Sequence, residues 1–136
     1  MKTKNAILTD FYAVVKATPA IVALDGGIYK NTRPNTSQLE DCVISLIPGT
    51  VAKFIQSGAL YIKLFYLDNN NNNTYSEDEL RGEYMEGLLQ DLSTVFLNLN
   101  QYSFDIQSRE TGTEAVQTAK VWQHYAILKI NFEILN

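Results

Sequence analysis

Residues 57–67 read SGALYIKLFYL, and this stretch decides the fold of the chain. After the turn-forming pair Ser57-Gly58 the side chains are almost all apolar, and many are aromatic, which favours extended backbone. Lys63 is the one charged residue of the run. A run of this length without a polar face is typical of a central strand that is partly covered on both sides. One face would hold Leu60, Ile62, Leu64 and Tyr66, and the other Tyr61, Lys63 and Phe65.

A second strand is predicted just before it. Residues 41–47 place Cys42, Ile44 and Leu46 on one face. We expect Pro48-Gly49 to end this strand, because proline cannot donate to a strand ladder. The two strands would then pair as an antiparallel hairpin.

The residues ahead of this hairpin predict two helices. Apolar side chains recur at three- and four-residue spacing over residues 5–17, as in an amphipathic helix. Thr18-Pro19 begins a short second helix with Thr18 as its N-cap, and Gly26-Gly27 ends it. Residues 28–30 are a short extended piece, and the turn-forming residues 31–39 predict a loop.

A third helix is predicted after the five asparagines at 69–73, which we expect to form a flexible loop. Ser76 and Glu79 have the spacing of a capping box, so this helix would run from about 77 to 98. Its buried stripe would be Leu80, Tyr84, Leu88, Leu92, Val95 and Leu99, widened by Met85, Leu89 and Phe96, and its solvent face Glu79, Glu83 and Glu86.

Two further strands close the predicted sheet. Residues 102–107 and 122–134 alternate apolar and polar side chains, and the polar residues 109–120 between them predict an extended loop or ribbon. The order helix–helix–strand–strand–helix–strand–strand indicates one α+β domain over residues 1–136. Its sheet would be four-stranded and antiparallel, with the N-terminal helix and the long helix packed on one face.

Composition excludes several classes of protein. The chain has 136 residues, of which 46% are hydrophobic, with a single cysteine and a net charge of −4. These values are typical of one globular domain without a disulfide framework. No apolar run reaches the roughly 18 residues that span a bilayer. The first ten residues also lack the apolar stretch of a signal peptide, so we expect no association with a membrane.

The charge is concentrated in residues 68–91, where seven acidic residues stand against a single arginine, Arg81. This segment therefore carries −6, and the rest of the chain sums to +2. No cluster of Lys and Arg is present in the sequence, which argues against tight binding of a phosphate backbone. An acidic face repels nucleic acid and suits a protein past which DNA must move without sticking.

Residues 68–79 imitate the spacing of a calcium-binding loop. Asp68 and Glu79 occupy its first and twelfth positions, but Asn73 stands where such loops have glycine, and a strand precedes the segment instead of a helix. Because only two carboxylates are offered, we favour a flexible loop followed by a capped helix. We expect no metal and no cofactor.

The other candidates for chemistry have plainer interpretations. His124 and Cys42 lie on predicted apolar strand faces, so we expect a core histidine bonded to the backbone and a small core thiol. A hydrolase using Cys42 and His124 on adjacent strands is the enzymatic alternative. Glu40-Asp41 precedes a strand and predicts two solvated charges, and Gly26-Gly27 lacks the context of a phosphate-binding loop. We expect no catalytic residue.

Three segments of the sequence carry a family resemblance. They are Pro19-Ala20-Ile21-Val22-Ala23-Leu24-Asp25-Gly26-Gly27-Ile28-Tyr29, Arg33-Pro34-x-x-Ser37-x-x-Glu40-Asp41-Cys42-Val43-Ile44 and Gln56-Ser57-Gly58-Ala59-Leu60-Tyr61-Ile62-Lys63-Leu64-Phe65-Tyr66-Leu67-Asp68. Together with the order of elements over about residues 5–135, they resemble the small tail-completion or tail-terminator proteins of long-tailed bacteriophages. The asparagine loop at 68–75 has no counterpart that we can assign in that family.

The resemblance implies a structural virion protein of the tail or neck, made in the cytoplasm of the host bacterium, that assembles into a homo-oligomeric ring, usually a hexamer. Such a ring caps the tail tube or joins it to the neck, and DNA passes through its lumen without sequence-specific binding. The family offers no catalytic residue to carry over. Two alternatives remain open: a head–tail connector or neck ring, and a small monomeric adaptor that binds a partner protein through a tyrosine-rich surface.

A ring needs two different contact patches on each subunit, and long polar connections are where we expect them. We expect the segment 109–120 to reach a neighbouring subunit or the tube, and Arg33 with the loop 31–39 to supply part of the opposing patch. The expected interface residues are Arg33, Arg109, Glu110, Thr111, Thr113 and Glu114, and the expected acidic lumen or surface face is Glu79, Glu83 and Glu86.

Overall fold

The described residues form three helices and seven strands. The structure is a computed structural model that describes residues 2–51, 54–72, 74–116 and 121–135. The helices are α1 (Lys4–Lys16), α2 (Pro19–Val22) and α3 (Glu79–Leu97). The strands are β1 (Ile28–Lys30), β2 (Cys42–Val51), β3 (Ile55–Leu67), β4 (Asn69–Asn71), β5 (Thr74–Ser76), β6 (Ser103–Val116) and β7 (Val121–Leu135).

Five of the strands form one mixed sheet in the order β1-β2-β3-β7-β6. β3 is central and pairs antiparallel with β2 and β7, which confirms the predicted hairpin. β1 pairs in parallel with β2, placing Ile28 opposite Cys42, so the expected four-stranded antiparallel sheet is wrong. Three residues are too few to reveal an alternating pattern, and the loop after β1 supplies the length that a parallel crossover needs.

The hairpin strands extend further than the sequence predicted. β2 continues through Pro48-Gly49 to Val51, with a register shift between Pro48 and Val51. β1 covers β2 only as far as Ile44, so β2 is an edge strand at Pro48. An edge position tolerates the missing N–H of a proline, and Pro48-Gly49 therefore does not end the strand.

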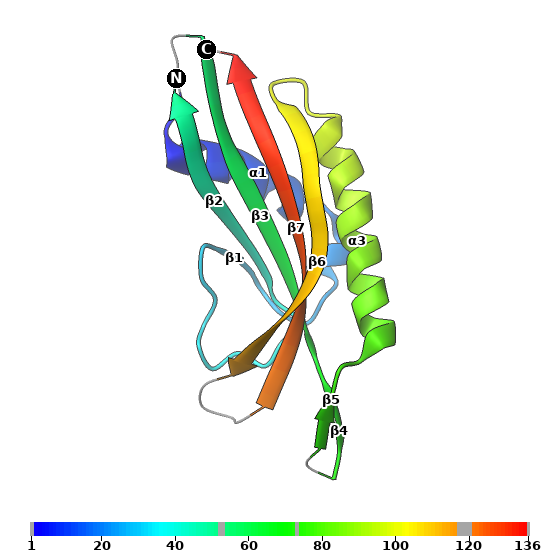
Figure 1. The fold of residues 1–136 in the computed structure, drawn as a ribbon. Coiled ribbons are helices and arrows are strands. Elements are labelled where there is room, and N and C mark those ends of the chain that lie inside the picture. Colours follow the sequence, from blue (N-terminus) through cyan, green and yellow to red (C-terminus); the bar gives the residue numbers. More distant parts are fainter. Residues whose placement is uncertain (1, 52–53, 73, 117–120, 136) are drawn as a thin grey trace.

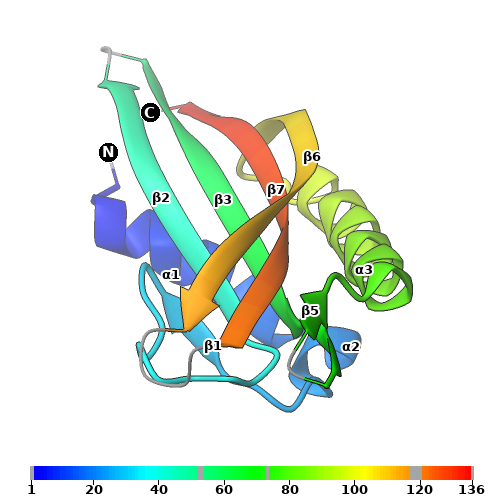
Figure 2. The ribbon, with the colours of Figure 1, turned by 60° about the horizontal axis from the view of Figure 1, so that its bottom comes forward.

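Both long helices pack on the same face of the sheet (Figures 1 and 2). Phe11 of α1 lies at the centre of this layer, with its ring centroid 5.6 Å from that of Phe96, 4.7 Å from Tyr102 and 5.2 Å from Phe132. The α+β layering predicted from the sequence is thus confirmed. The even-numbered strand residues that meet the helices include Cys42, Ile44, Leu46, Leu60, Ile62, Leu64, Tyr66, Ala126, Leu128, Ile130 and Phe132.

α3 is turned relative to the expected stripe. Leu80 is 80% exposed, and Tyr84 and Val95 are nearly half exposed, so their predicted burial is wrong. Gly82 is buried instead, and a Cβ there would lie 2.7 Å from the Tyr66 hydroxyl, so the helix approaches β3 closely at this glycine. The residues of α3 that do pack inward are Met85, Leu88, Leu89, Leu92, Ser93 and Phe96.

The expected capping box is also wrong. Ser76 ends β5, and the N-cap of α3 is Asp78, whose side chain accepts a hydrogen bond from the Arg81 N–H. The asparagine run was expected to form a flexible loop, but Asn69–Asn71 form strand β4, which pairs antiparallel with β5. Asn72 adopts φ 51°, a left-handed conformation that asparagine tolerates, and the hairpin projects beyond the end of the main sheet (Figure 1).

The segment 109–120 is the tip of a second long hairpin. β6 pairs with β7 from Ser103–Glu133 to Val116–Val121, so residues 109–116 form a ribbon, and residues 117–120 lie outside the described chain. A register shift between Ile106 and Ser108 marks a bulge. Bulges increase twist, and beyond this one β6 swings across the front of the sheet (Figure 2). None of the described helices is long and apolar enough to cross a membrane.

Candidate assembly surfaces

A buried charged junction lies where the loop 31–39 meets the sheet. Asp41 is fully buried, and its carboxylate accepts hydrogen bonds from Arg33 Nη1 (3.1 Å), Ser37 Oγ (2.5 Å) and the Gly27 N–H (3.0 Å). The expectation of a solvated charge at Asp41 is therefore wrong. A carboxylate can be buried here because every one of these contacts supplies a donor, one of them cationic.

Arg33 is the cation of this junction. Its side chain is only 8% exposed, its Nη2 donates to Gln123 Oε1 on β7 (2.6 Å), and its guanidinium lies 3.6 Å from the centroid of the Phe65 ring. These contacts fix the loop 31–39, which the structure confirms as a loop, against the sheet. Arg33 is thus engaged within its own chain, and the loop around it offers more surface to a neighbour than its guanidinium does.

Glu40 extends the junction to α3. Arg81 donates to both carboxylate oxygens of Glu40, at 2.6 and 2.5 Å, in the bidentate geometry that makes arginine–carboxylate pairs specific. Glu40 is thus paired and not simply solvated, and it ties the loop before β2 to the first turn of α3. A Cβ at Gly26 would lie 2.4 Å from Asp41 Oδ1, so this glycine allows a close approach. The prediction that Gly26-Gly27 ends the second helix is wrong, because α2 already ends at Val22, with Ala23 as its C-cap.

A second polar cluster lies on the helix-covered face near the β4–β5 hairpin. His124 Nδ1 contacts Asp68 Oδ1, so the partner of the histidine is a carboxylate and not the expected backbone group. The His124 ring stacks on that of Tyr66, and the Tyr66 hydroxyl donates to Glu77 Oε1 (2.6 Å). Burial, together with this bond to Glu77, raises the pKa of Tyr66.

Cys42 is a core thiol, as the sequence predicted. It is buried, and burial with the neighbouring Asp41 charge raises its pKa to about 12, which disfavours the nucleophilic thiolate. The adjacency assumed for a Cys42–His124 pair is wrong, because β3 lies between β2 and β7. In the ladder Cys42 stands opposite Leu64, and Leu64 stands opposite Ala126.

Residues 68–79, which imitate the spacing of a calcium-binding loop, contain a strand ladder in the structure. The ladder between β4 and β5 occupies the middle of residues 68–79, and Asp68 is engaged with His124. Within the described ranges, no group of three or more His, Cys, Asp or Glu side chains is placed to hold a metal ion.

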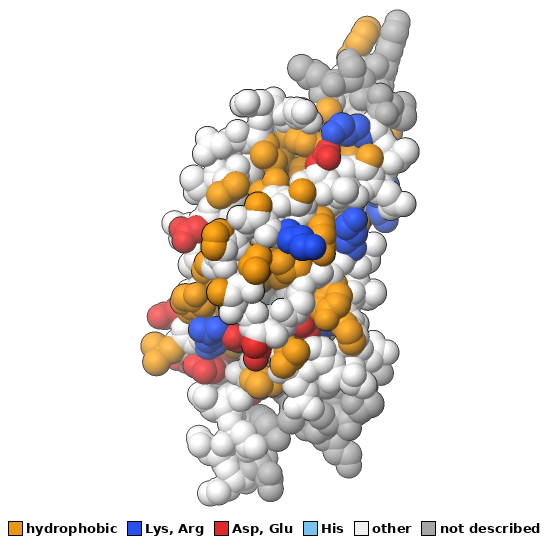
Figure 3. All heavy atoms as spheres, turned by 180° about the vertical axis from the view of Figure 1, so that it is seen from behind, with side chains coloured by type: hydrophobic (Ala, Val, Ile, Leu, Met, Phe, Trp, Pro, Cys, Tyr) orange, Lys and Arg blue, Asp and Glu red, His pale blue; other side chains and the backbone are white. Residues whose placement is uncertain are grey.

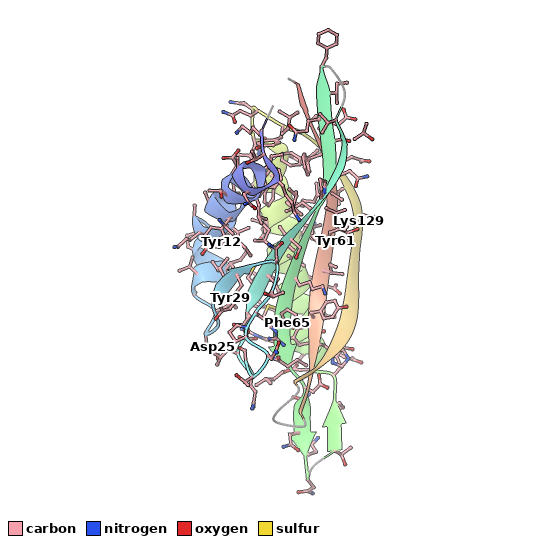
Figure 4. The ribbon with its side chains drawn as sticks, turned by 90° about the vertical axis from the view of Figure 1, so that its left-hand side faces the viewer. Tyr12, Asp25, Tyr29, Tyr61, Phe65 and Lys129 are labelled. Carbon is pink, nitrogen blue, oxygen red and sulfur yellow. The ribbon has the colours of Figure 1, made fainter. Side chains whose placement is uncertain are left out.

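The sheet face opposite the helices carries aromatic and cationic side chains. Lys63 Nζ lies 4.5 Å from the Tyr125 ring centroid, and Lys129 Nζ lies 5.5 Å from that of Tyr61. These side chains are half-buried, and neither lysine forms a salt bridge within the part of the chain that the structure describes. We call the residues Ile47, Tyr61, Lys63, Tyr125, Ile127 and Lys129 the open patch. Figure 4 labels Tyr61 and Lys129 on the side of the sheet away from the helices.

A hollow and an apolar tip lie at the upper end of this face. The hollow has a volume of about 560 Å³, and its lining includes Ile47, Asp105 and Glu133. Beyond it the β2–β3 hairpin exposes Val51, Ile55 and Phe54, the last with 65% of its surface accessible. The β4–β5 hairpin, with its exposed asparagines, projects from the opposite end (Figure 1).

The first turns of α3 carry exposed acidic side chains together with exposed Leu80 and Tyr84. Glu79, Glu83 and Glu86 are exposed, as the sequence predicted, and they share these turns with Leu80 and Tyr84. Seen from the helix side, the molecule shows hydrophobic side chains scattered among acidic and basic ones (Figure 3). We call these five residues the α3 patch.

The other expected interface residues lie together on one strand. Arg109, Glu110, Thr111, Thr113 and Glu114 all belong to the distal part of β6, an edge strand with β7 as its only neighbour in the described sheet. The structure therefore groups them on one strand and brings that strand close to Arg33, because Glu114 stands opposite Gln123, whose side chain accepts a hydrogen bond from Arg33. The aromatic and lysine residues of the open patch were not singled out from the sequence, although their odd-numbered spacing along residues 61–65 and 125–129 places them on one face.

Comparison of the sequence with models of known protein families and with curated proteins finds no match.

Proposed function

We propose that this chain is a structural protein of a bacteriophage virion that assembles into a ring at the end of the tail tube or in the neck. The ring would be a hexamer, synthesised in the host bacterial cytoplasm, with DNA passing through its lumen and with tail tube or neck proteins as its other partners. The proposal rests on the resemblance of three segments to tail-terminator proteins and on one structural observation. That observation is the presence of two differently built surface patches, the open patch and the α3 patch, on opposite sides of the sheet.

Two unlike patches are what a closed ring requires. A ring is a head-to-tail assembly in which each subunit offers one surface to the copy before it and another to the copy after it. Hairpins that project from the two ends of the sheet would then face the two openings of the ring. The apolar β2–β3 tip and the polar β4–β5 hairpin differ enough to contact different neighbours.

The acidic side chains support passage of DNA and not its retention. Glu79, Glu83 and Glu86 are exposed, and their negative charge would repel phosphates at the lumen or on the surface of the ring. The distal part of β6, with Arg109, Glu110, Thr111, Thr113 and Glu114, remains our proposal for a contact with a neighbouring subunit or with the tube. As part of a ladder, it provides a strand edge for that contact, which a free loop would not.

Mass measurement in solution combined with negative-stain imaging tests the proposal. A tail or neck ring predicts ring-shaped particles, formed by the purified chain at high concentration or on addition of purified tail tubes. A neck connector predicts rings that bind heads and not tail tubes. An adaptor predicts a 15.4 kDa monomer under every one of these conditions, and that result would overturn the ring.

The proposed contact through the distal part of β6 can be tested without deleting that segment. Replacing 111–118 by a short turn would delete strand pairs such as Thr111–Ala126, so it is not neutral for the fold. The triple variant T111A/T113A/E114A keeps the backbone ladder. We expect it to keep the melting temperature and to lose ring formation or tail joining, whereas normal assembly would remove this segment from the interface.

A further inference from the structure

We propose that the α3 patch of one copy docks on the open patch of the next copy, and that this contact closes the ring. The inference deepens the proposed function and rests on it. It changes the place proposed above for two of the acidic residues: Glu83 and Glu86 would lie at the junction between subunits and not at the lumen.

The α3 patch has the composition of a contact surface. Leu80 is 80% exposed in the first turn of the helix, and the ring of Tyr84 is nearly half exposed, with the Arg81 guanidinium 4.6 Å from its centroid. A large exposed aliphatic side chain beside a tyrosine is a common feature of protein interfaces. Next along the helix, the surface is hollowed over about 440 Å³ and lined by Glu83, Glu86, Gly87 and Gln90.

Gly87 keeps this hollow open. A Cβ built on it meets no heavy atom within 4 Å, so the glycine is not required by packing within the chain. Glycine in the middle of a helix is unfavourable relative to alanine. A side chain of a second copy could enter at this position between the two glutamates, and the open patch offers two long lysines.

The open patch is complementary to the α3 patch in charge, and it offers apolar side chains to the apolar residues of that patch. Lys63 and Lys129 carry its positive charge, and each ammonium lies over a tyrosine ring. Neither forms a salt bridge with a side chain that the structure describes. Their flat, partly apolar surroundings include Ile127 and the exposed Ile47, which could cover Leu80 and Tyr84. Opposite charges at a docking surface steer the encounter and set its register.

The positions of the two patches exclude a symmetric pair as the main contact. α3 packs on the even-numbered face of the sheet, and the lysines are on the odd-numbered face, which Figure 4 shows turned away from the helices. Joining α3 patch to α3 patch would bring glutamates against glutamates, which is repulsive. Joining unlike patches leaves a free α3 patch at one end of the growing oligomer and a free open patch at the other, as ring closure needs.

Charge reversal tests this contact. Variant A carries K63E and K129E, and variant B carries E83K and E86K; the control K4E/K16E reverses two exposed lysines of α1 outside both patches. Alone, A and B should fold with normal circular dichroism yet shift from ring mass to the 15.4 kDa monomer, while the control still forms rings. An equimolar mixture of A and B should recover the rings, because each reversed patch then meets a complementary one in an alternating order.

Each result has a distinct consequence. If the wild-type chain and variants A and B all form rings equally well, the docking is wrong and the ring proposal stands. If A and B are monomeric and their mixture stays monomeric, the two patches do not contact each other and the inference is overturned. If the wild-type chain forms no ring at high concentration or with tail tubes, the proposed function and this contact are both overturned.

Discussion

The two faces of the five-stranded sheet are made from alternate residues of the same strands, yet they are built on different chemistry. The even-numbered face is filled by aliphatic and aromatic side chains that α1 and α3 cover. The odd-numbered face carries lysines laid over tyrosine rings and is only half-buried. A central strand with no polar face can serve both, because a lysine stem and a tyrosine ring pack on a sheet while their polar ends stay in water.

The odd-numbered face is itself divided. At its lower end the loop 31–39 covers it, with Arg33 over Phe65 and bonded to buried Asp41, and at its upper end it is open. Substitutions in the covered region should lower the stability of the fold, whereas substitutions in the open region should weaken association with other copies of the chain. Four substitutions or modifications can break or sharpen this contrast.

The largest effect on stability is expected from Asp41→Ala. Removing one member of a buried ion pair leaves the other charge uncompensated, which costs about 3–5 kcal/mol. Arg33 would lose its carboxylate while remaining over Phe65. Chemical denaturation measures the loss. The double variant R33M/D41A is the control: it should be less destabilised than D41A alone, and an equal or larger loss would mean that Asp41 acts through Gly27 and Ser37 instead of through the arginine.

Leu92→Ala compares the core with the surface on a single helix. Leu92 is fully buried in the cluster shared by α3 and the sheet, so its truncation should cost about 2–5 kcal/mol through lost burial and a cavity. Leu80→Ala on the same helix should change stability by less than about 0.5 kcal/mol, since Leu80 is exposed. Urea midpoints of the two variants measured side by side decide the matter, and similar midpoints would mean that the helix is turned as the sequence first suggested.

The layering of the fold could be predicted from the sequence, and the exact faces of α3 could not. The central strand, its hairpin and the packing of helices on one face followed from apolar periodicity, which is a signal carried by many residues at once. For α3 the apolar residues surround much of the helix, so periodicity alone left its rotation open. The close approach of Gly82 to Tyr66 fixes that rotation, and such a contact joins residues that are distant in sequence.

The charged junction was missed for the same reason. Asp41 is polar at the start of an apolar strand, a place where solvated charges are usual. Nothing local reveals that Arg33 donates to Asp41 and also to Gln123 on β7. The extended conformation of residues 28–30 was predicted, but the parallel pairing of β1 with β2 was not. The β4–β5 ladder was missed, because three-residue strands show no pattern. The candidate interface residues on β6 could be named from polarity, but their grouping on a single edge strand required the register with β7.

Alkylation of Cys42 probes the even-numbered face, which the helices cover, without a substitution. The pKa of the thiol is raised to about 12 by burial, so very little thiolate exists at pH 8 in the folded chain. The thiol has a pKa of 9.0 when unperturbed, and it should react readily once the chain is unfolded. We therefore expect iodoacetamide labelling in the native state to follow the rate of unfolding, measured by mass spectrometry. Labelling as fast in the folded protein as in urea would place Cys42 at an accessible site.

The smallest effect on stability is expected from deleting two of the asparagines at 69–73. The β4–β5 ladder is a two-stranded hairpin with three residues in each strand, and such a hairpin contributes little stability by itself. Loop closure entropy depends only weakly on length, so the free energy of unfolding, measured by urea denaturation, should change by less than about 0.5 kcal/mol. The variant keeps Asp68 and Glu77, which contact His124 and Tyr66 in the body of the domain. Tyr66→Phe, which removes the bond to Glu77 but not the hairpin, should therefore cost more than the deletion. If the deletion proves the more costly of the two, the hairpin contributes to the fold itself and is not available as a free projection at the end of the sheet.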